Sequence, residues 1–243
     1  MRLIVAAMLA IGVAHAAPPK AEAFDPLLEM AGLRLLCEQG APLLQRGMSP
    51  AQQAQLSQAF AADGVCRDLA KGLADRVDRR QLQQAQQLLD SPLARRFTAA
   101  ERAVGDDGGA ALASYRAQLA ARPPRQDRLA LVRRLDAAAR TTALAALLRY
   151  EVGKTQALLA LRERGESIDE QALSSQTQVQ AEALRKSSAA AVESFMLFAY
   201  RRIPSEQLAE YVALYEQPAL SHLLESSVQV MPQLFAVRRD ALR

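Results

Sequence analysis

The chain is poor in aromatic residues and in histidine. None of its 243 residues is Trp, aromatic residues make up 5% of the sequence, and there are two His. Strands favour aromatic and β-branched residues in alternation, and no such run bounded by a hairpin turn occurs. Alanine, Leu, Gln, Arg and Glu, which favour helices, are abundant instead. The composition therefore predicts an all-α protein folded as a multi-helix bundle.

The scarcity of His also excludes several kinds of site. His15 lies in a segment that we expect to be cleaved, which leaves His222 as the only His of the mature chain. One His cannot form a cluster of His metal ligands. The sequence also has no Gly-x-Ser-x-Gly elbow, no phosphate-binding Gly-rich loop and no His-Glu-x-x-His motif. We therefore predict no metal site, no cofactor and no catalytic residue.

Residues 1–16 have the pattern of a secretory signal. Arg2 supplies a positive start, an apolar run follows, and Ala14-His15-Ala16 has the small-x-small form of a cleavage site. The apolar run is shorter than the roughly 20 residues needed to span a bilayer. No Cys follows it directly, which disfavours a lipid anchor. We expect cleavage near Ala16 and a mature chain, starting at Ala17, in the periplasm or outside the cell.

The two cysteines of the chain are Cys37 and Cys66. In an exported protein an even number of cysteines indicates a disulfide. A redox-active pair is less consistent with the spacing, because there is no Cys-x-x-Cys motif. Two thiols alone also do not make a closed metal site. We therefore predict a structural disulfide between them.

A helix, a Pro-marked corner and a second helix are predicted twice, 126 residues apart. A Pro disfavours helical geometry at the preceding residue but suits the first turn of the next helix, so each corner ends one helix and begins another. The segments therefore predict two related helical halves, each with such a unit. The matched positions are Val77/Ile203, Gln81/Gln207, Leu82/Leu208, Leu88/Leu214, Asp90/Glu216, Pro92/Pro218 and Phe97/Leu223.

The halves are expected at residues 17–104 and 127–243, joined by a linker at 105–126 that contains a short helix. Gly105-Asp-Asp-Gly-Gly109 and Pro123-Pro124 mark this linker. In the first half we expect Gly64 to close a helix. In the second half we expect one long helix over 127–164, stopped by Gly165, and another over 167–200.

The second corner resembles a known family, the bacterial envelope proteins that carry domain of unknown function number 2059. Ile203, Gln207-Leu208, Leu214-Tyr215 and Gln217-Pro218 carry the resemblance, and Leu88 with Ser91-Pro92 forms a weaker first copy. The likeness covers residues 150–225 well and 60–104 less well. The family often has Gly two residues beyond the Pro, where this chain has Ala94 and Leu220. The resemblance implies an all-α, secreted or periplasmic module of uncharacterised activity.

The favoured functional interpretation is a non-enzymatic binding or interaction module for a partner protein or for an apolar or amphipathic envelope ligand. Repeated helical units commonly leave a groove between them, and apolar and aromatic side chains line such sites. Core packing is the alternative role of the same side chains. The candidate lining residues are Phe195, Met196, Phe198, Tyr200, Tyr211 and Tyr215.

Two other functions stay open. Acids one helical turn apart could serve a hydrolase-like enzyme that uses carboxylates, and buried acids converging in a cleft would indicate it. Paired arginines could bind an anionic surface if they gather on one face. These pairs are Arg79-Arg80, Arg95-Arg96, Arg133-Arg134, Arg201-Arg202 and Arg238-Arg239. Peripheral contact with a membrane is compatible with this interpretation, nucleic acid is not expected, and the sequence leaves the oligomeric state open.

Overall fold

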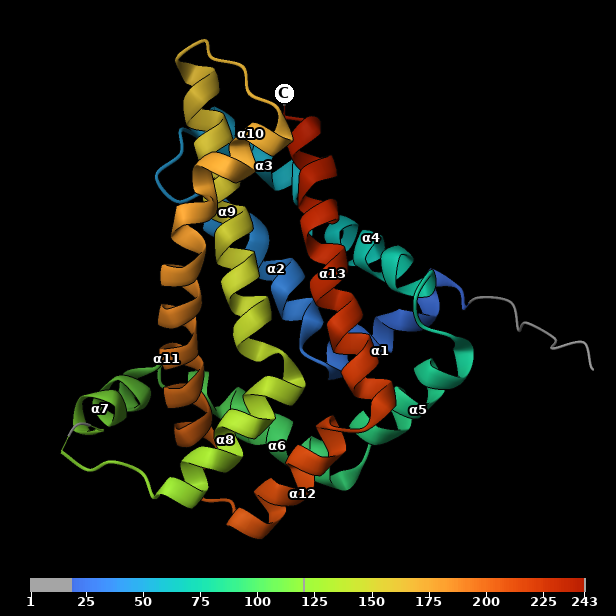
Figure 1. Cartoon of the computed structure of the whole chain (residues 1–243), viewed down its shortest axis with the longest axis vertical. Helices are drawn as coiled ribbons and strands as arrows, with labels where there is room; N and C mark the ends of the chain where they lie inside the picture. The colour runs from blue at the N-terminus through green and yellow to red at the C-terminus, as the bar shows by residue number, and fades with distance from the viewer. Residues whose placement is uncertain (1–18, 120, 243) are drawn as a thin grey trace, which may run out of the picture.

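A computed structural model describes residues 19–119 and 121–242 of the chain. The predicted signal, residues 1–16, lies outside the described residues. Within them the regular secondary structure is entirely helical, which confirms the prediction of an all-α multi-helix bundle (Figure 1).

The first part of the chain forms short helices, and the second part contains the longest ones. Up to the linker these are η1 (Ala21–Phe24), α1 (Asp25–Met30), α2 (Leu33–Leu44), α3 (Pro50–Ala59), α4 (Ala62–Ala74), α5 (Arg79–Leu89), α6 (Pro92–Arg102) and η2 (Ala103–Gly105). The linker contains α7 (Ala110–Gln118), where a short helix is expected. Then follow α8 (Gln126–Ala139), α9 (Thr141–Glu163), α10 (Glu170–Thr177), η3 (Gln178–Gln180), α11 (Ala181–Ala199), α12 (Ser205–Tyr215) and α13 (Pro218–Asp240).

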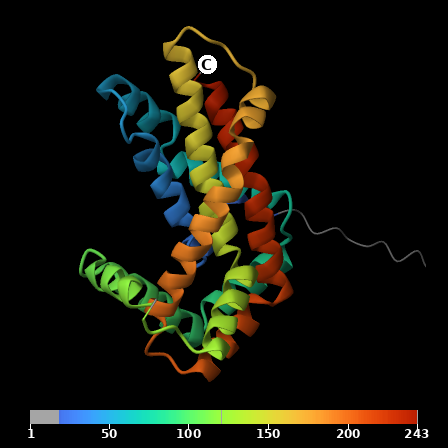
Figure 2. The same ribbon diagram turned by 60° about the vertical axis from the view of Figure 1, so that its left-hand side comes forward.

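Three long helices, α9, α11 and α13, run along the long axis of the molecule (Figure 1). Helix α9 packs against α11, α13 and α2, whereas α13 also packs against α4 and α5. Helices α5, α6, α8 and α12 gather at one end, and α7 projects to the side (Figure 2). One apolar core contains side chains from both predicted halves, including fully buried Leu69 and Leu223. The halves therefore share this core, and a smaller separate cluster contains Leu158, Leu161 and Leu173.

Two glycines of α4 allow α13 to approach closely. A Cβ atom on Gly72 would lie 2.6 Å from Cγ1 of Val230, and one on Gly64 would lie 3.3 Å from the Arg238 guanidinium. The order of these contacts shows that α4 and α13 run antiparallel. Arg238 donates hydrogen bonds to the Ala59 carbonyl oxygen and, at 2.5 Å, to Oδ2 of Asp68. The expectation that Gly64 closes a helix is wrong, because α4 continues through it and its missing side chain leaves room for Arg238.

Both predicted corners are present, and the helices before them have the same length. Helices α5 and α12 each have 11 residues, and Pro92 and Pro218 each occupy the first position of the helix that follows. Apolar side chains at matched positions are buried in both units, so the corner fixes which faces reach the core. These buried pairs are Val77/Ile203, Leu82/Leu208, Ala85/Tyr211, Leu89/Tyr215, Ala94/Leu220 and Phe97/Leu223.

The two units differ at the start of the first helix. Asp78 caps α5 by accepting a hydrogen bond from the Gln81 N–H at 2.8 Å, and Oε1 of Gln81 accepts one from the Asp78 N–H at 3.0 Å. Pro204 occupies the equivalent cap of α12 and has no N–H to donate. Oε1 of Gln207 is accordingly buried without a hydrogen-bond partner among the described residues. The Asp-to-Pro difference therefore removes this reciprocal cap from the second unit.

The long helix expected over 127–164 is wrong, because the chain breaks at Arg140. Arg140 has a φ of 54°, in the left-handed region, and separates α8 from α9. The Asp136 carboxylate accepts hydrogen bonds from the N–H and the hydroxyl of Thr142, both at 2.7 Å, and so caps the start of α9. Arg140 in turn pairs with Glu225 on α13 at 2.8 Å. Contacts on both sides of the break therefore hold it in place, while Gly165 follows α9 with a φ of 75° as expected.

The second long helix, expected over 167–200, is also wrong in detail. The structure has α10, a 3-10 turn and α11 in its place. The Thr177 hydroxyl donates to the Leu173 carbonyl oxygen at 2.9 Å and also approaches that of Ser174. Such side-chain bonds to the preceding turn compete with regular helical geometry. The interruption therefore coincides with a competing hydroxyl.

Candidate functional site

An aromatic cluster forms where the two helix–corner–helix units meet. The Phe97 ring on α6 stacks on Tyr211 of α12 with 3.9 Å between centroids and meets Tyr200 edge-on at 4.9 Å. Tyr211 also contacts Tyr215 at 5.0 Å, and its hydroxyl donates to the Tyr215 hydroxyl oxygen at 3.3 Å. All four rings are buried. The two units are therefore in direct contact through the Phe97 and Tyr211 rings.

Glu101 of α6 adds a carboxyl group to this aromatic cluster. The Tyr200 hydroxyl donates a hydrogen bond to Oε1 of Glu101. Burial raises the pKa of Glu101, although the Tyr200 hydrogen bond and the charge of Arg102 act in the opposite direction. Burial, followed by the nearby Glu101 charge, also raises the pKa of Tyr215 to about 12. At neutral pH the phenols are therefore protonated and can donate hydrogen bonds.

The predicted lining residues separate into different environments. Tyr200, Tyr211 and Tyr215 lie together in the aromatic cluster just described. Phe198 instead contacts Tyr115 of α7 at 5.4 Å, and the Arg201 guanidinium lies 3.6 Å from the Phe198 ring centroid.

Burial and position give these side chains a packing role. Met196 and Phe198 are buried, whereas Phe195 is half-buried against the core. None of the predicted lining residues lines either of the two hollows described below. Phe97 could be anticipated as core from the matched corner positions, but no sequence pattern marks Glu101.

A hollow of about 320 Å³ lies between α8 and α11. Val132, Ala189 and Ala190 provide its apolar wall, and Arg133, Asp136 and Glu193 provide the charged groups. Arg133 donates to Oε2 of Glu193 at 2.8 Å, which links the two helices. The volume is within the range of small-molecule sites. We refer to this feature as the α8–α11 hollow.

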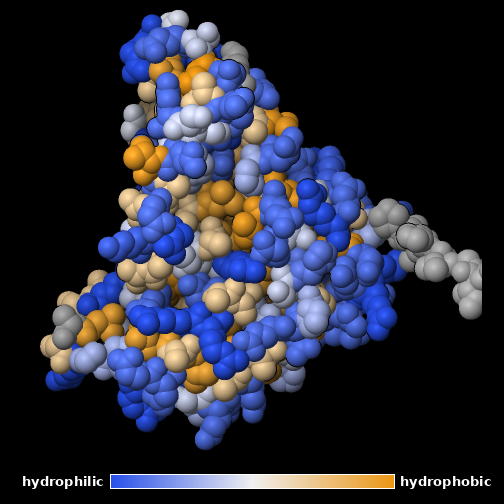
Figure 3. Space-filling model, in the orientation of Figure 1, coloured by the Kyte–Doolittle hydropathy of each residue, from blue (hydrophilic) through white to orange (hydrophobic). Residues whose placement is uncertain are grey.

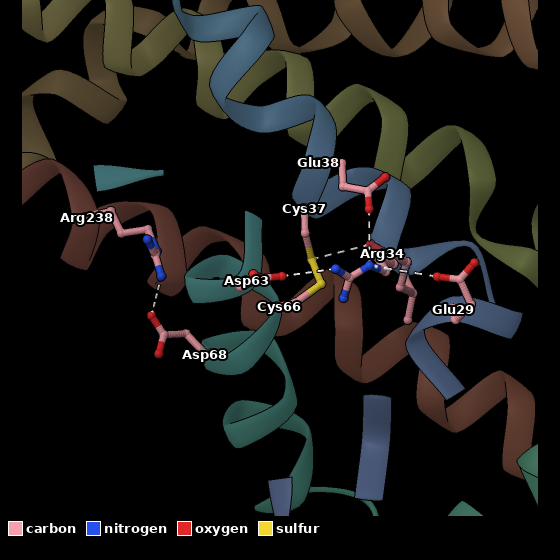
Figure 4. The surroundings of a disulfide bond; sticks show 9 residues. Glu29, Arg34, Cys37, Glu38, Asp63, Cys66, Asp68 and Arg238 are labelled. Carbon is pink, nitrogen blue, oxygen red and sulfur yellow. Dashed lines mark hydrogen bonds and ion pairs between the residues drawn. A yellow bond between two sulfur atoms is a disulfide. The ribbon is translucent and has the colours of Figure 1, made fainter. Parts of the chain in front are cut away.

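A second hollow, of about 250 Å³, lies beside the disulfide. Cys37 of α2 and Cys66 of α4 are joined with their Cα atoms 5.6 Å apart, as predicted. Cys66 and Ala70 contribute to the hollow, and so does Arg34, which donates to Asp63 at 3.0 Å and to Glu38 at 3.1 Å (Figure 4). Within this hollow Arg34 pairs with Asp63, and the disulfide fixes α2 to α4.

A buried ionic network joins α9, α10 and α13. Arg239, which is fully buried, pairs with Glu151 and with Glu170 at 2.6 Å each, and Lys154 pairs with Glu170 at 2.7 Å. Burial raises the pKa of Glu151 against the opposing effect of Arg239. For Glu170 burial also favours the neutral form, but hydrogen bonds from Arg239 and Lys154 outweigh it and lower the pKa. In the sequence Arg239 is marked only as one of two adjacent arginines, and its acidic partners are not predicted.

Five of the ten paired arginines bind carboxylates of the described residues. Arg133 binds Glu193, and Arg134 binds Glu216 at 2.9 Å. Arg95 binds Asp90 at 2.6 Å, and both arginines of the last pair, Arg238 and Arg239, bind acids. Pairing of this kind reduces the field that an anionic surface would meet. These contacts therefore give no support to the alternative function, which requires the pairs to gather on one basic face.

Polar residues cover most of the face in Figure 3, while apolar residues gather where α9 and α13 run side by side. Large apolar side chains exposed within the described part of the chain are Leu35, Val179 and Val237. No helix in that part is long and apolar enough to cross a membrane. Across residues 19–119 and 121–242, no group of three or more His, Cys, Asp or Glu is placed to hold a metal ion.

Comparison with protein families, with curated proteins and with solved structures gives no match to this chain.

Replacing Arg239 by Met should destabilise the protein by roughly 3–5 kcal/mol, because it leaves the buried Glu151 carboxylate without its cation. Glu151→Gln should cost clearly less, since the pKa of Glu151 is already raised by burial. Urea unfolding at neutral pH measures both. Arg162→Met, at an exposed position of α9, is the matched control. Equal losses for Arg239→Met and the control would contradict a structural role of the network.

The raised pKa of Glu101 predicts a specific pH dependence. The folded state binds this proton more tightly than the unfolded state, so its contribution to stability is present at low pH and is lost as pH rises through the folded pKa. This occurs above the ordinary value of about 4.3. Glu101→Gln should therefore be more stable relative to wild type at neutral pH than at acidic pH. Tyr200→Phe should extend the pH range over which this contribution is lost, because removing the Tyr200 hydrogen bond, which lowers the pKa of Glu101, raises that pKa further.

Unfolding free energies of wild type, Glu101→Gln and Tyr200→Phe, measured across this pH range, provide the comparison. The difference between wild type and Glu101→Gln isolates this carboxyl from the other titrating groups. Parallel pH profiles for these two proteins would show that Glu101 has the same pKa in the folded and unfolded states.

Proposed function

We propose that this chain is an exported helical binding module that holds a small amphipathic ligand in the α8–α11 hollow. The observation that carries the proposal is the composition of this hollow, with an apolar wall beside a charged pair. An apolar wall favours a hydrocarbon group, and the charged side chains favour a polar group at the opposite end. The ligand class is therefore a small molecule with an apolar part and one charged group.

Small side chains create the space for the apolar part. Ala189 and Ala190 are adjacent on α11, opposite the fully buried Val132 of α8. The two helices pack against each other, and α8 also packs against α12. The walls of the hollow are thus parts of core helices, which favours a preformed site over one that must fold around its ligand.

The charged pair can exchange partners at little cost. The side chains of Arg133 and Glu193 are 65% and 34% exposed, and exposed ion pairs contribute about 0–1 kcal/mol. A ligand carboxylate can therefore displace Glu193 from Arg133. Asp136 is less suited to bind a ligand, because its two oxygens already accept hydrogen bonds from Thr142.

We further propose export to the periplasm, or secretion, and membership of the family with domain of unknown function number 2059. The signal-like pattern of residues 1–16 and the disulfide between Cys37 and Cys66 support export. The helix, corner and helix around Pro218 support the resemblance, since they contain the residues that carry it. A carboxylate-based enzyme receives no support from Glu151 and Glu170, because basic side chains already bind both acids.

Titration with decanoate, which combines an apolar chain with a carboxylate, tests the site. We expect wild type to bind it and Ala190→Leu to bind at least roughly tenfold more weakly, because the larger side chain occupies the hollow. Arg133→Gln should also weaken binding, whereas Glu193→Gln should strengthen it by releasing Arg133 from its competitor. Calorimetry measures the affinities, and thermal unfolding checks that the variants fold.

Ala117→Leu on α7 provides the matched control, because Ala117 is exposed and lies outside the hollow. Equal affinities for Ala190→Leu and Ala117→Leu would contradict the proposed site. Decyltrimethylammonium is a second probe, of opposite charge. If the wild type binds neither decanoate nor decyltrimethylammonium, the proposed ligand class is contradicted.

A further inference from the structure

Two arginines that pair with no carboxylate of the described residues lie where α11 ends and α12 begins. Arg128 of α8 donates to the Tyr200 carbonyl oxygen at 2.5 Å and to the Ser205 hydroxyl oxygen at 3.3 Å. Arg201 lies over the Phe198 ring and donates to the Phe198 carbonyl oxygen at 2.7 Å. These neutral acceptors hold both guanidinium groups at the last turn of α11. They leave other N–H groups of each fork uncommitted.

Tyr115 of α7 brings a hydroxyl donor to the same place. Its ring packs against Phe198, the ring on which Arg201 lies. Burial raises the pKa of the Tyr115 phenol, while the charges of Arg128 and Arg201 both lower it. The Phe198 ring thus brings together Tyr115 of α7 and Arg201 at the end of α11. Arg128 of α8 reaches the same turn through the Tyr200 carbonyl oxygen.

Positive charge is in excess at this junction. The acids that lie nearest in sequence, Asp127 and Glu206, are exposed, and Asp127 pairs with Arg125 at 3.6 Å. The carboxyl end of a helix carries only about half a negative charge, which does not balance two guanidinium groups. Burial and the nearby charge of Arg125 lower the pKa of Arg128, and they outweigh the opposing effects of Tyr115 and Asp127. The junction therefore gives Arg128 a poor environment for its charge, and a bound anion would improve it.

We propose that Arg128, Arg201 and Tyr115 form a binding site for a phosphate group. Two planar guanidinium groups and a hydroxyl offer donors from three side chains, which suits a phosphate with at least three acceptor oxygens better than a carboxylate with two. The site is separate from the α8–α11 hollow and rests on different residues. The phosphate group belongs either to a small phosphorylated molecule or to a phospholipid headgroup, and the recognition chemistry is the same.

Calorimetric titration with inorganic phosphate and with glycerol phosphate, at constant ionic strength, tests the first source. Sedimentation with phosphatidylglycerol vesicles, compared with phosphatidylcholine vesicles, tests the second. We expect Arg201→Gln and Tyr115→Phe to weaken binding by roughly tenfold or more, since each removes a donor to a charged ligand. Tyr115→Phe retains the ring on Phe198 and removes only the hydroxyl.

Arg202→Gln is the matched control, because it removes the same charge from the adjacent exposed position. It should change the affinity by less than about twofold, as expected for an exposed charge outside the site. If the protein binds phosphatidylglycerol vesicles but neither soluble phosphate, and Arg201→Gln weakens that binding, the result supports the site and identifies a lipid headgroup as the ligand. Two results would overturn the proposal: no Arg201-dependent binding to any of these probes, or equal weakening by Arg202→Gln.

Discussion

The close approach of α13 to α4 is the constraint on which the rest of the structure depends. The end of the chain packs against its first half because Gly72 has no side chain at the point where Val230 reaches α4. Along the same seam Gly64 makes room for Arg238, which binds Asp68. On this helix Arg239 also joins α9 and α10 to the assembly. Helix α13 therefore contacts both halves and also contributes Arg239 to the buried ionic network.

The corner before α13 links this seam to the aromatic cluster. Pro218 fixes the bend between α12 and α13, and α12 presents Tyr211 to Phe97 of the first half. Tyr200 at the end of α11 contacts the same ring, and its carbonyl oxygen accepts from Arg128. Packing of apolar rings thus positions the charged groups around the end of α11. The proposed phosphate site and the α8–α11 hollow both depend on helices held in this way.

The sequence predicts the parts of this structure that have local causes. The corners at Pro92 and Pro218 follow from the backbone restriction of proline, and the disulfide follows from there being only two cysteines. The predictions at Gly64 and at Arg140 are wrong for different reasons. Gly64 makes room for a residue of the distant α13, whereas the break at Arg140 combines a local cap, from Asp136 to Thr142, with a distant ion pair on α13. The partners of Arg239 on α9 and α10 are 88 and 69 positions away. No local pattern could identify such contacts.

The stability of Gly72→Ala tests the central role of the α4–α13 contact most directly. Helix propensity alone predicts that Ala stabilises this helical position by about 1 kcal/mol. The structure predicts the opposite sign, a loss of roughly 1–3 kcal/mol, because the added Cβ atom overlaps Val230. Val230→Ala should reduce that loss in the double variant, and Gly64→Ala should cost less because the Arg238 side chain can shift. An increase in the free energy of unfolding for Gly72→Ala would contradict the account.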